Sequence, residues 1–478
     1  MNKKYLYFLL VPFILNGCAN NKNNSQSNKQ EIDDSNCLIK EETTITFLSM
    51  VDDSYLPKLQ SMIASFEKTE PHVKVIISNP LGAGNYSMLE NIVVASHFKG
   101  NLPDLVQCYP DNVIKYMGRE FVLELNKYIN NSEYGIDKNE FIDTFWNEGT
   151  QYNVEGTYSL PFCKSTELLY YNATALLGRT IPGINNDAPL TEEFFNDITW
   201  EALFDVICPA IKTYNDALPE EDKILKTSDS SAIFTYDSDE NFFITLANQY
   251  GYGYTSIKDG KGSVDFDNPE MKALVKKLKA AKDAGYLQTK GSYHNYVSYL
   301  FQKQNALFTV SSTAGLSYNY NNKNPFLIKA ARLPHAAGKE YSSINQGPSI
   351  CILDHNDENR ALASYLLWKH ITNEEFSLDW ALTTGYMCIR KNPYESKTYK
   401  DALVVEDQTD LFKVAKAENL IKTAEVRSST FNTPIFKGSS NARTNVGILL
   451  KDCLLSENLE ENIDQLFKEA SDEAETHL

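Results

Sequence analysis

The sequence predicts an α/β fold of two lobes, from the pattern of its first part and from its length. An alternating, β-branched segment over Thr43–Leu48 predicts a strand, and apolar residues at helical spacing over Leu56–Phe66 predict a helix. A strand over Val73–Ile77, a helix over Tyr86–Phe98 and a strand over Leu105–Cys108 follow. This βαβαβ order is typical of a parallel sheet whose ligand sites lie beyond the carboxyl ends of its strands. At 478 residues, the chain is long enough for two such units.

The alternation of strands and helices continues to the end of the chain, and no internal repeat is visible. A helix over residues 269–284 has an N-cap candidate in Asn268 and a terminating glycine in Gly285. Further strands are predicted over residues 158–160, 167–171, 306–310 and 350–353, and further helices over residues 200–214, 358–371, 374–383 and 454–474.

The N-terminal residues have the pattern of a secretory leader. Two lysines precede an apolar run over Tyr5–Leu15, which is shorter than the roughly 20 residues that a membrane-spanning helix needs. The run ends in L-N-G-C, which resembles the lipobox of bacterial lipoproteins, although Asn16 stands where a smaller residue is usual. In that class the cysteine is acylated and the chain is cut before it. Residues 1–17 are therefore expected to be a signal peptide, and Cys18 to be lipidated.

The segment after the lipobox reads as a tether. Residues 20–35 are polar and poor in aliphatic side chains, so they cannot bury a core. We predict that residues 18–40 hold the lipidated cysteine and a flexible link to the folded part. The alternative, a buried N-terminal helix with a chance cysteine, does not account for a polar stretch at this place.

Composition excludes several classes of function. A formal net charge of −18 argues against nucleic-acid partners, which need basic patches. No later segment is apolar enough to span a bilayer, so attachment to the membrane would rest on the N-terminal lipid. The 28 tyrosines offer flat faces edged by hydroxyl groups, which suit sugar rings, although most of them are expected to cover ordinary surface.

The cysteines show no metal or redox pattern. Eight are present, and they form no C-x-x-C pair and no regular spacing with histidine, so neither a metal nor another cofactor is expected. Cys108, Cys163, Cys208 and Cys351 lie in apolar contexts and are predicted to be buried thiols.

An ordered set of short motifs resembles the family-1 extracellular solute-binding proteins, which serve carbohydrate ABC importers. The resemblance spans about residues 45–457 and is nearest the branch that includes glycerol-3-phosphate and glycerophosphodiester binders. Its motifs occur in family order over Phe66–Val75, Gly84–Leu89, Asn101–Tyr109, Tyr158–Asn172, Ser311–Gly315, Gln346–Ser349 and Thr384–Arg390.

The resemblance implies a periplasmic-binding-protein-like fold, with a ligand cleft between two α/β lobes joined by hinge strands. It places residues 41–155 in lobe 1 together with a return segment over about 306–345, and residues 156–305 in lobe 2 together with about 346–478. The implied function is capture of a sugar or glycerol phosphate by hinge closure and delivery to a membrane permease. The implied location is the outer face of the cell membrane, as a monomer that is not an enzyme.

The resemblance also implies a set of ligand-contacting residues. Tyr86 and Tyr386 would offer stacking faces and hydroxyl groups from opposite lobes. Ser165 and Ser312 would hydrogen-bond a polyol or phosphate oxygen, and Gly347 would let its backbone N–H approach the ligand. The alternative for each is a turn residue or a packed aromatic.

Two departures from the glycerophosphate binders bear on the ligand. Those proteins carry an acidic residue directly after the tyrosine that matches Tyr109, whereas this chain has Pro110, and Asp111 is the substitute candidate. They also carry an arginine shortly after a Lys-Gly pair, whereas here two serines follow that pair and Arg443 comes later. Arginine matches phosphate geometry well, so its absence from the expected position weakens the case for a phosphate ligand. A neutral oligosaccharide is therefore at least as good a candidate.

Asp237 has two interpretations. It aligns with a loop where the relatives place ligand-facing aromatics and could bind sugar hydroxyls, but the helix N-cap of the following segment is the favoured interpretation.

Two other classes of function stay open on the sequence alone. A surface glycoside hydrolase would need paired carboxylates, and 63 acidic residues make chance pairs plentiful. No G-x-S-x-G, H-E-x-x-H or G-x-x-x-x-G-K motif is present. An adhesin or structural surface lipoprotein would not need to close around a small molecule.

Overall fold

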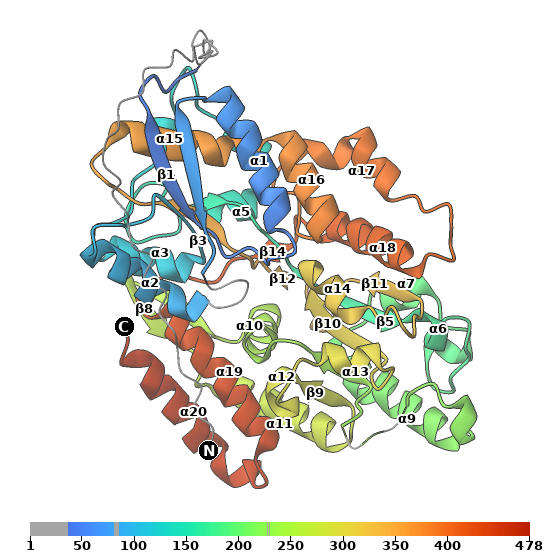
Figure 1. The fold of residues 1–478 in the computed structure, drawn as a ribbon. Helices are drawn as coiled ribbons and strands as arrows, with labels where there is room; N and C mark the ends of the chain where they lie inside the picture. Colours follow the sequence, from blue (N-terminus) through green and yellow to red (C-terminus); the bar gives the residue numbers. More distant parts are fainter. Residues whose placement is uncertain (1–36, 81–85, 227, 229) are drawn as a thin grey trace, which may run out of the picture.

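Two five-stranded sheets form the centres of two lobes in the computed structural model, which describes residues 37–80, 86–226, 228 and 230–478 (Figure 1). In the first sheet the strand order is β2-β1-β3-β13-β4. β1 pairs in parallel with β2 and β3, whereas β13 runs antiparallel to β3 and β4. The strands are β1 (Thr43–Leu48), β2 (Val73–Ser78), β3 (Leu105–Cys108), β4 (Leu160–Pro161) and β13 (Ser349–Ile352).

Helices cover both faces of the first sheet, which is why its strands are rich in apolar residues. Ile45 and Phe47 of β1 are fully buried in the core formed with α1 (Leu56–Thr69) and α15 (Glu358–Ile371). Leu48 and Val106 point into a second core with α2 (Tyr86–Phe98) and α3 (Pro110–Met117). The predicted βαβαβ opening is confirmed.

The second sheet has the strand order β11-β5-β10-β6-β9. β10 runs antiparallel to β5 and parallel to β6. One face packs on a core that includes α10 (Asp239–Tyr250), α11 (Pro269–Asp283), α19 (Ser439–Leu455) and α20 (Leu459–Glu475), and the other on α13 (Ser298–Gln302), α14 (Leu316–Asn319) and α18 (Leu411–Val426). The strands are β5 (Glu167–Asn172), β6 (Phe234–Tyr236), β9 (Leu287–Thr289), β10 (Phe308–Ser312) and β11 (Ile328–Ala331).

The predicted assignment of the C-terminal half to the lobes is wrong in two places. Residues 306–345 were expected to return to lobe 1, but β10 and β11 complete the second sheet. Residues 346–478 were expected in lobe 2, but β13 and α15 belong to the first sheet and its core. Strand pairing decides this, because β10 lies between β5 and β6 and buries Phe308 and Val310 among them.

Two predicted helices are interrupted. The segment over residues 200–214 divides into α8 (Trp200–Ala202), a wider turn over Leu203–Ile207 and α9 (Cys208–Ala217). Pro209 explains the wider turn, because proline has no N–H to donate and its ring clashes with the preceding turn. The segment over residues 454–474 begins at the end of α19, breaks at Ser456, and resumes as α20. Asn268 caps α11 as predicted, its side chain accepting from the Met271 N–H at 2.8 Å, and Gly285 follows the helix with φ +79°.

The predicted tether is shorter than expected at its C-terminal end. Cys37 and Ile39 are buried, and the N–H groups of Leu38 and Ile39 donate to the Glu70 carboxylate at 3.0 and 3.1 Å. Residues 37–40 are thus part of the first lobe, while Cys18 and the rest of the predicted tether lie outside the described residues. The four cysteines predicted to be buried thiols are confirmed as such.

Three strands lie side by side where the lobes join. The first is the segment from β4 to β5, the second runs from β12 (Ser343–Ile344) to β13, and the third is β14 (Thr430–Phe431). Ser165 and Gln346 exchange backbone hydrogen bonds of 2.9 and 3.0 Å, and β12 pairs in parallel with β14. We call these the junction strands.

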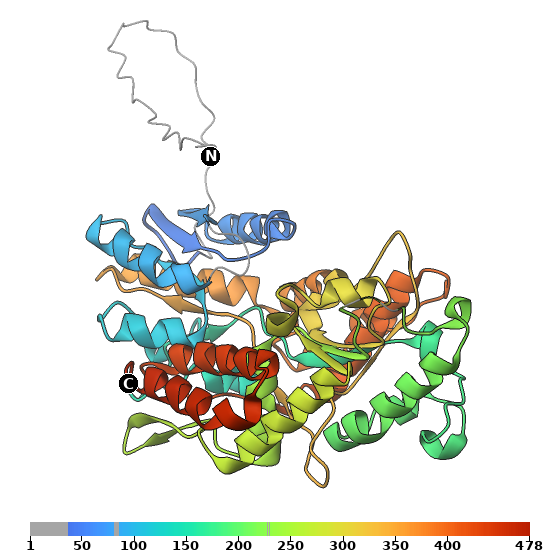
Figure 2. The ribbon, with the colours of Figure 1, turned by 90° about the horizontal axis from the view of Figure 1, so that it is seen from below.

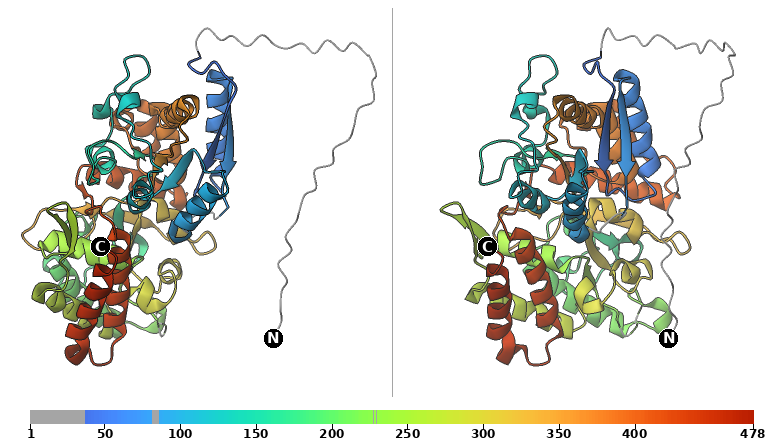
Figure 3. Two further views of the ribbon diagram at one scale, coloured as in Figure 1. Left: turned by 90° about the vertical axis from the view of Figure 1, so that its left-hand side faces the viewer. Right: turned by 60° about the vertical axis from the view of Figure 1, so that its left-hand side comes forward.

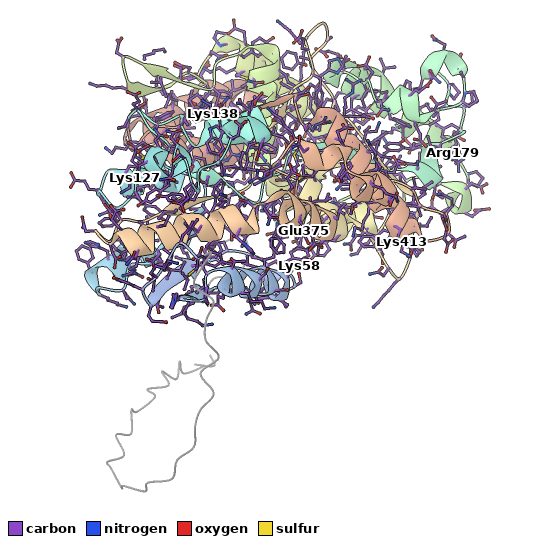
Figure 4. All side chains as sticks on the ribbon, turned by 90° about the horizontal axis from the view of Figure 1, so that it is seen from above. Lys58, Lys127, Lys138, Arg179, Glu375 and Lys413 are labelled. Atoms are coloured by element: carbon purple, nitrogen blue, oxygen red, sulfur yellow. The ribbon has the colours of Figure 1, made fainter. Side chains whose placement is uncertain are left out.

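One contact outside the junction also brings parts of the two lobes together. α19 approaches α3 of the first lobe (Figure 2), and it packs along α20 at the lower edge of the molecule (Figure 3). Within the first lobe, on the upper face, Lys58 of α1 forms an ion pair with Asp379 of α16 (Glu374–Thr384). Lys127 and Arg179 mark opposite ends of the molecule (Figure 4). Across the described ranges, no helix is long and apolar enough to cross a membrane.

Candidate functional site

A cavity of about 530 Å³ lies where the two lobes face one another. Asp52 follows β1, Asp237 follows β6, and Ser312 ends β10, and all three line this cavity. The cavity therefore lies beyond the carboxyl ends of strands from both sheets, which is where the βαβαβ pattern places a ligand site. We call it the interlobe cavity.

The interlobe cavity is lined by three carboxylates, from Asp52, Glu167 and Asp237. Among the described residues that form its wall, none is lysine, arginine or histidine. A low-dielectric wall that carries one sign of charge repels anions and strengthens hydrogen bonds to its carboxylates.

Glu167 is the most buried of these carboxylates, although it begins a strand. It accepts hydrogen bonds from the Tyr236 hydroxyl and, at 2.8 Å, from the Asn241 side chain. Burial raises the pKa of Glu167 to about 7, and the two hydrogen bonds only partly offset that effect. Near neutral pH this side chain is divided between its charged and neutral forms.

Asp237 presents a free acceptor. Its Oδ1 atom is buried and has no hydrogen-bond partner in the described part of the chain. Burial raises the pKa of Asp237 to about 6, while Lys290 acts in the opposite direction. The favoured interpretation of Asp237 as a helix cap is wrong, because Ser238 caps α10 by accepting from the Asn241 N–H at 3.1 Å.

Asp52 contacts the opposite lobe. Its carboxylate accepts from the N–H and hydroxyl of Ser54 at 2.9 and 2.6 Å, and these bonds lower the pKa of Asp52. The hydroxyl of Tyr318 on α14 also reaches it at 3.4 Å. This contact spans the mouth of the cavity in the conformation seen here.

Aromatic rings cover much of the remaining wall. Tyr55 packs edge-to-face on Trp380 with ring centroids 6.3 Å apart, and Tyr386 lines the wall on the same lobe. The second lobe contributes three exposed tyrosines at the rim: Tyr296, Tyr299 and Tyr318 are 53%, 46% and 59% exposed. The Lys290 ammonium lies over the Tyr296 ring, 4.5 Å from its centroid, so the other two rings are the open ones. Such open faces suit the apolar sides of sugar rings.

Tyr86 and Tyr109 form a pair beside the interlobe cavity and are not among its lining residues. Their rings meet edge-to-face with centroids 4.7 Å apart. Burial raises the pKa of Tyr109 to about 12, whereas nearby Arg443 and the Gly347 N–H lower it. Burial also raises the pKa of Tyr86 well above its usual value, with further contributions from Tyr109 and Tyr386. The two tyrosines thus connect the cavity wall at Tyr386 to Arg443.

The other predicted residues lie in different places. Ser165 and Gly347 are buried in the junction strands, where each takes part in backbone contacts. Asp111 accepts a hydrogen bond from Ser439 at the start of α19, so its carboxylate is already engaged. The structure brings Asp237, Ser312 and Tyr386 into one cavity and leaves Asp111 outside it.

A second cavity, of about 610 Å³, adjoins the first and shares Tyr296 with it. Its wall holds Lys290, Arg443 and Lys451, together with Asp239 and Glu240. We call it the basic cavity.

Arg443 is the most buried cation of the basic cavity. It donates to the Asn241 Oδ1 atom at 2.5 Å, and no carboxylate of the described residues lies within ion-pair distance of it. Burial alone lowers the pKa of Arg443, but Tyr254, Glu240 and Asp111 nearby outweigh that effect and raise it. A half-buried guanidinium without an ion pair is suited to hold an anionic group.

Sequence reasoning missed several lining residues. Glu167 carried a usable signal, since it is a charged residue at the head of the apolar strand E-L-L-Y-Y-N. Trp380 and Tyr55 carried none, because an aromatic residue at helical spacing predicts only a packed core. Asp52 and Gln346 could not be predicted either, because the packing of the two lobes decides whether their side chains point into the cavity.

No group of three or more potential metal ligands is found within the described ranges. The contacts in the interlobe cavity are hydrogen-bond acceptors, donors and aromatic faces, and this arrangement is suited to reversible binding.

The two lobes, the junction strands and a cavity between the sheets define a two-lobed binding protein. Solved structures share this fold. The glycerophosphocholine complex of UgpB from Mycobacterium tuberculosis matches with a TM-score of 0.68 at 15% identity, over 91% of this chain and 98% of that chain. The sugar-binding protein MalE from Xanthomonas citri matches with a TM-score of 0.65 at 15% identity, over 91% and 98% of the two chains.

The chain belongs to the family of bacterial extracellular solute-binding proteins, whose pattern it matches over residues 61–405. Among curated relatives, the sn-glycerol-3-phosphate-binding periplasmic protein UgpB of Salmonella typhimurium is 22% identical over 356 residues, which cover 74% of this chain and 76% of the relative. UgpB of Escherichia coli K12 is 21% identical over 363 residues, with the same coverage. These relatives are binding proteins.

Proposed function

We propose that this chain is the solute-binding component of a bacterial ABC importer and that it captures a carbohydrate between its lobes. The lobes close around the ligand, and the closed form delivers it to the membrane permease. Family membership supports the solute-binding role, and the relatives whose names include sugars and glycerol phosphate support the ligand classes.

The residues that line the interlobe cavity support a neutral carbohydrate as the ligand. Three carboxylates, from Asp52, Glu167 and Asp237, can accept hydrogen bonds from sugar hydroxyls. The ring of Tyr386, and at the rim those of Tyr299 and Tyr318, can pack on the apolar faces of the sugar. A phosphate placed among three carboxylates would be repelled, because like charges in a low-dielectric site cost several kcal/mol.

A glycerol-phosphate-like ligand is the second candidate, and Arg443 is the observation that favours it. Its guanidinium is half-buried, without an ion pair, and near Tyr109. A phosphate that reached Arg443 would gain charge-assisted hydrogen bonds at the boundary between the interlobe cavity and the basic cavity.

Titration calorimetry on the chain from Asn20 onward, preceded by a thermal-shift screen, separates the candidates. The probes are maltose, maltotriose, sn-glycerol-3-phosphate and glycerophosphocholine. A ligand at about a hundred times its dissociation constant adds about 2.7 kcal/mol to the free energy of unfolding, which a melting curve resolves. Binding of a neutral sugar supports the proposal, and binding of the phosphate compounds alone overturns the choice of ligand. Chromatography after incubation tests the glycoside hydrolase alternative, since a binding protein returns its ligand unchanged.

We also propose that Cys18 is lipidated and holds the protein at the outer face of the cell membrane. A lipid anchor fits a protein of net charge −18, because electrostatic attraction to an anionic bilayer is excluded. Metabolic labelling with a palmitate analogue is expected to label the wild type and not Cys18→Ser. The same variant should move from the membrane fraction to the medium. A Cys18→Ser protein that stayed with the membrane would contradict the anchor.

A further inference from the structure

A buried ion pair occupies the centre of the junction. The side chain of Lys164 is fully buried, with 0% exposure, and its ammonium pairs with the carboxylate of Glu148 on α5 (Asp143–Glu148). The same ammonium donates to the Gly347 carbonyl at 2.9 Å. A lysine this deep is rare in proteins, and it is retained only where the groups around it satisfy its charge.

The pair is bonded to all three junction strands. Lys164 itself belongs to the first strand. On the second strand, Asn345 donates to Glu148 at 3.1 Å, and Ser349 at its end also donates to Glu148 at 3.1 Å. The third strand is reached through Asn432, which accepts from Asn345 at 2.7 Å. One charge pair thus fixes the spacing of every strand at the junction.

The position of Gly347 depends on this arrangement. Its φ of +92° lies in the left-handed region, and a Cβ atom there would lie 2.0 Å from the carbonyl oxygen of Cys163. The Lys164 ammonium holds the carbonyl of Gly347, and the N–H of Gly347 acts on the hydroxyl of Tyr109. The N–H and the carbonyl of Gly347 belong to two successive peptide groups, so the backbone conformation of this one residue connects the ion pair to the residues beside the interlobe cavity.

The second junction strand also holds polar atoms without partners. Asn345 Oδ1 and Gln346 Nε2 are buried and unbonded within the described part of the chain. Gln346 lines the interlobe cavity and accepts a hydrogen bond of 3.2 Å from Asn241. Such atoms are costly to leave unpaired, so this strand has groups available for new bonds when the lobes move.

From this geometry we infer that Lys164 and Glu148 are positioning residues of the hinge. They keep the three junction strands in register and orient the carbonyl of Gly347 while the lobes open and close. The inference rests on the proposed closure of the lobes, but its test below uses no ligand.

Physical chemistry separates this role from a general stabilising one. Replacing both members of a buried ion pair by neutral side chains of similar volume often leaves stability unchanged, because desolvation offsets the attraction. What the pair supplies is geometry, since charge-assisted hydrogen bonds are shorter and more directional than neutral ones. Removal of the pair should therefore loosen the junction strands and leave the rest of both lobes as they were.

Hydrogen exchange of the ligand-free protein, compared between wild type and the double variant Lys164→Met, Glu148→Gln, tests the inference. The amides of Cys163, Ser165 and Gln346, which bond across the first two junction strands, are expected to exchange at least about ten times faster in the variant. Amides between β1 and β2 should keep their wild-type rates. Equal acceleration everywhere, or no acceleration at the junction, would overturn the inference.

Two further variants, one mild and one a control, test whether the effect is specific to the junction. Ser349→Ala removes only one hydrogen bond to Glu148 and should speed the same junction amides by about two- to threefold, with folding intact. The control is Arg360→Met with Asp104→Asn, a part-buried pair of the first lobe with contacts of 2.7 and 2.8 Å. It should leave the junction amides unchanged. If the control loosened the junction as much as the double variant, the role assigned to Lys164 and Glu148 would be wrong.

Discussion

The interlobe cavity and the basic cavity meet at Tyr296 but have opposite chemistry. The interlobe cavity has three carboxylates and no cation among its described lining residues, whereas the basic cavity has Lys290, Arg443 and Lys451 with only two carboxylates. From this difference we expect a neutral polyol and a phosphate ester to be held in different places. The family resemblance alone could not separate the two.

A short chain of hydrogen bonds connects the two cavities. Arg443 donates to Asn241, and Asn241 donates in turn to Glu167 at 2.8 Å. The charge state of Glu167 therefore affects the polar groups of both cavities.

The largest effect should come from the proton on Glu167. Its pKa in the folded protein is about 7, against 4.5 for the unfolded chain. Between these values the folded protein keeps a proton that the unfolded chain has released. The Glu167 proton therefore contributes its full share to the free energy of unfolding below about pH 4.5, and this share is lost as the pH rises to about 7. The loss amounts to about 3 kcal/mol. Glu167→Gln should remove this slope, as measured by denaturant unfolding at about pH 5 and about pH 8. An unchanged slope would mean that Glu167 titrates normally.

The next effect concerns the opposed pair Asp237 and Arg443. If the ligand is a neutral sugar, Asp237→Asn should weaken binding by about 2 kcal/mol, about thirtyfold, since a charged acceptor is lost. Arg443→Met should then change the affinity little. A phosphate ligand should give the reverse order. Calorimetry of both variants with maltotriose and with sn-glycerol-3-phosphate decides between these outcomes. Equal losses in both variants would remove the distinction between the cavities.

A smaller effect is expected at the rim. Tyr299 is 46% exposed at the edge of the interlobe cavity. Tyr299→Ala should weaken binding of a longer saccharide by about 1 kcal/mol, because one stacking face is lost, and should leave a short saccharide unaffected. Comparison of maltotriose with maltose on the same variant gives the test. Equal losses for both sugars would place Tyr299 beside the first ring instead.

The smallest effect should come from the contact between Tyr318 and Asp52. Tyr318→Phe removes a long hydrogen bond of 3.4 Å that spans the lobes. The free energy of unfolding should fall by only about 0.5 kcal/mol, at the low end for a hydrogen bond. Chemical denaturation measures the stability, and small-angle scattering reports any change in lobe separation. A large expansion of the ligand-free protein would show that this contact holds the lobes together.

Much of the first lobe could be predicted from the sequence, because its elements are local patterns. The helix over residues 358–371 coincides with α15, whose start is set by Asp357 accepting from the N–H groups of Asn359 and Arg360. The assignment of β10 and β13 to sheets could not be predicted in this way. Alternation within a strand indicates that one face is buried, but it does not indicate which sheet supplies the neighbouring strands.

The candidate site divides in the same manner. Ser312 and Tyr386 were predicted from motifs, and both line the interlobe cavity. Asp111 was proposed as a substitute acid, yet Pro110 begins α3 and the carboxylate turns to Ser439 on the other lobe. The basic cavity was beyond prediction, since Lys290 and Arg443 are far apart in the chain and meet only through the packing of α12 (Lys290–Tyr293) and α19.

All seven cysteines in the described part of the chain are buried, and Cys108 and Cys351 lie with their sulfur atoms 3.5 Å apart between β3 and β13. Burial raises the pKa of the Cys163 and Cys351 thiols well above the usual value, so few thiolates are available to react. A single cysteine introduced at the exposed position of Tyr299 would then react far faster with a maleimide dye than any of these seven thiols. One dye attached at this position would make the protein a fluorescent sensor, in which the colour or brightness of the dye reports ligand in the cleft.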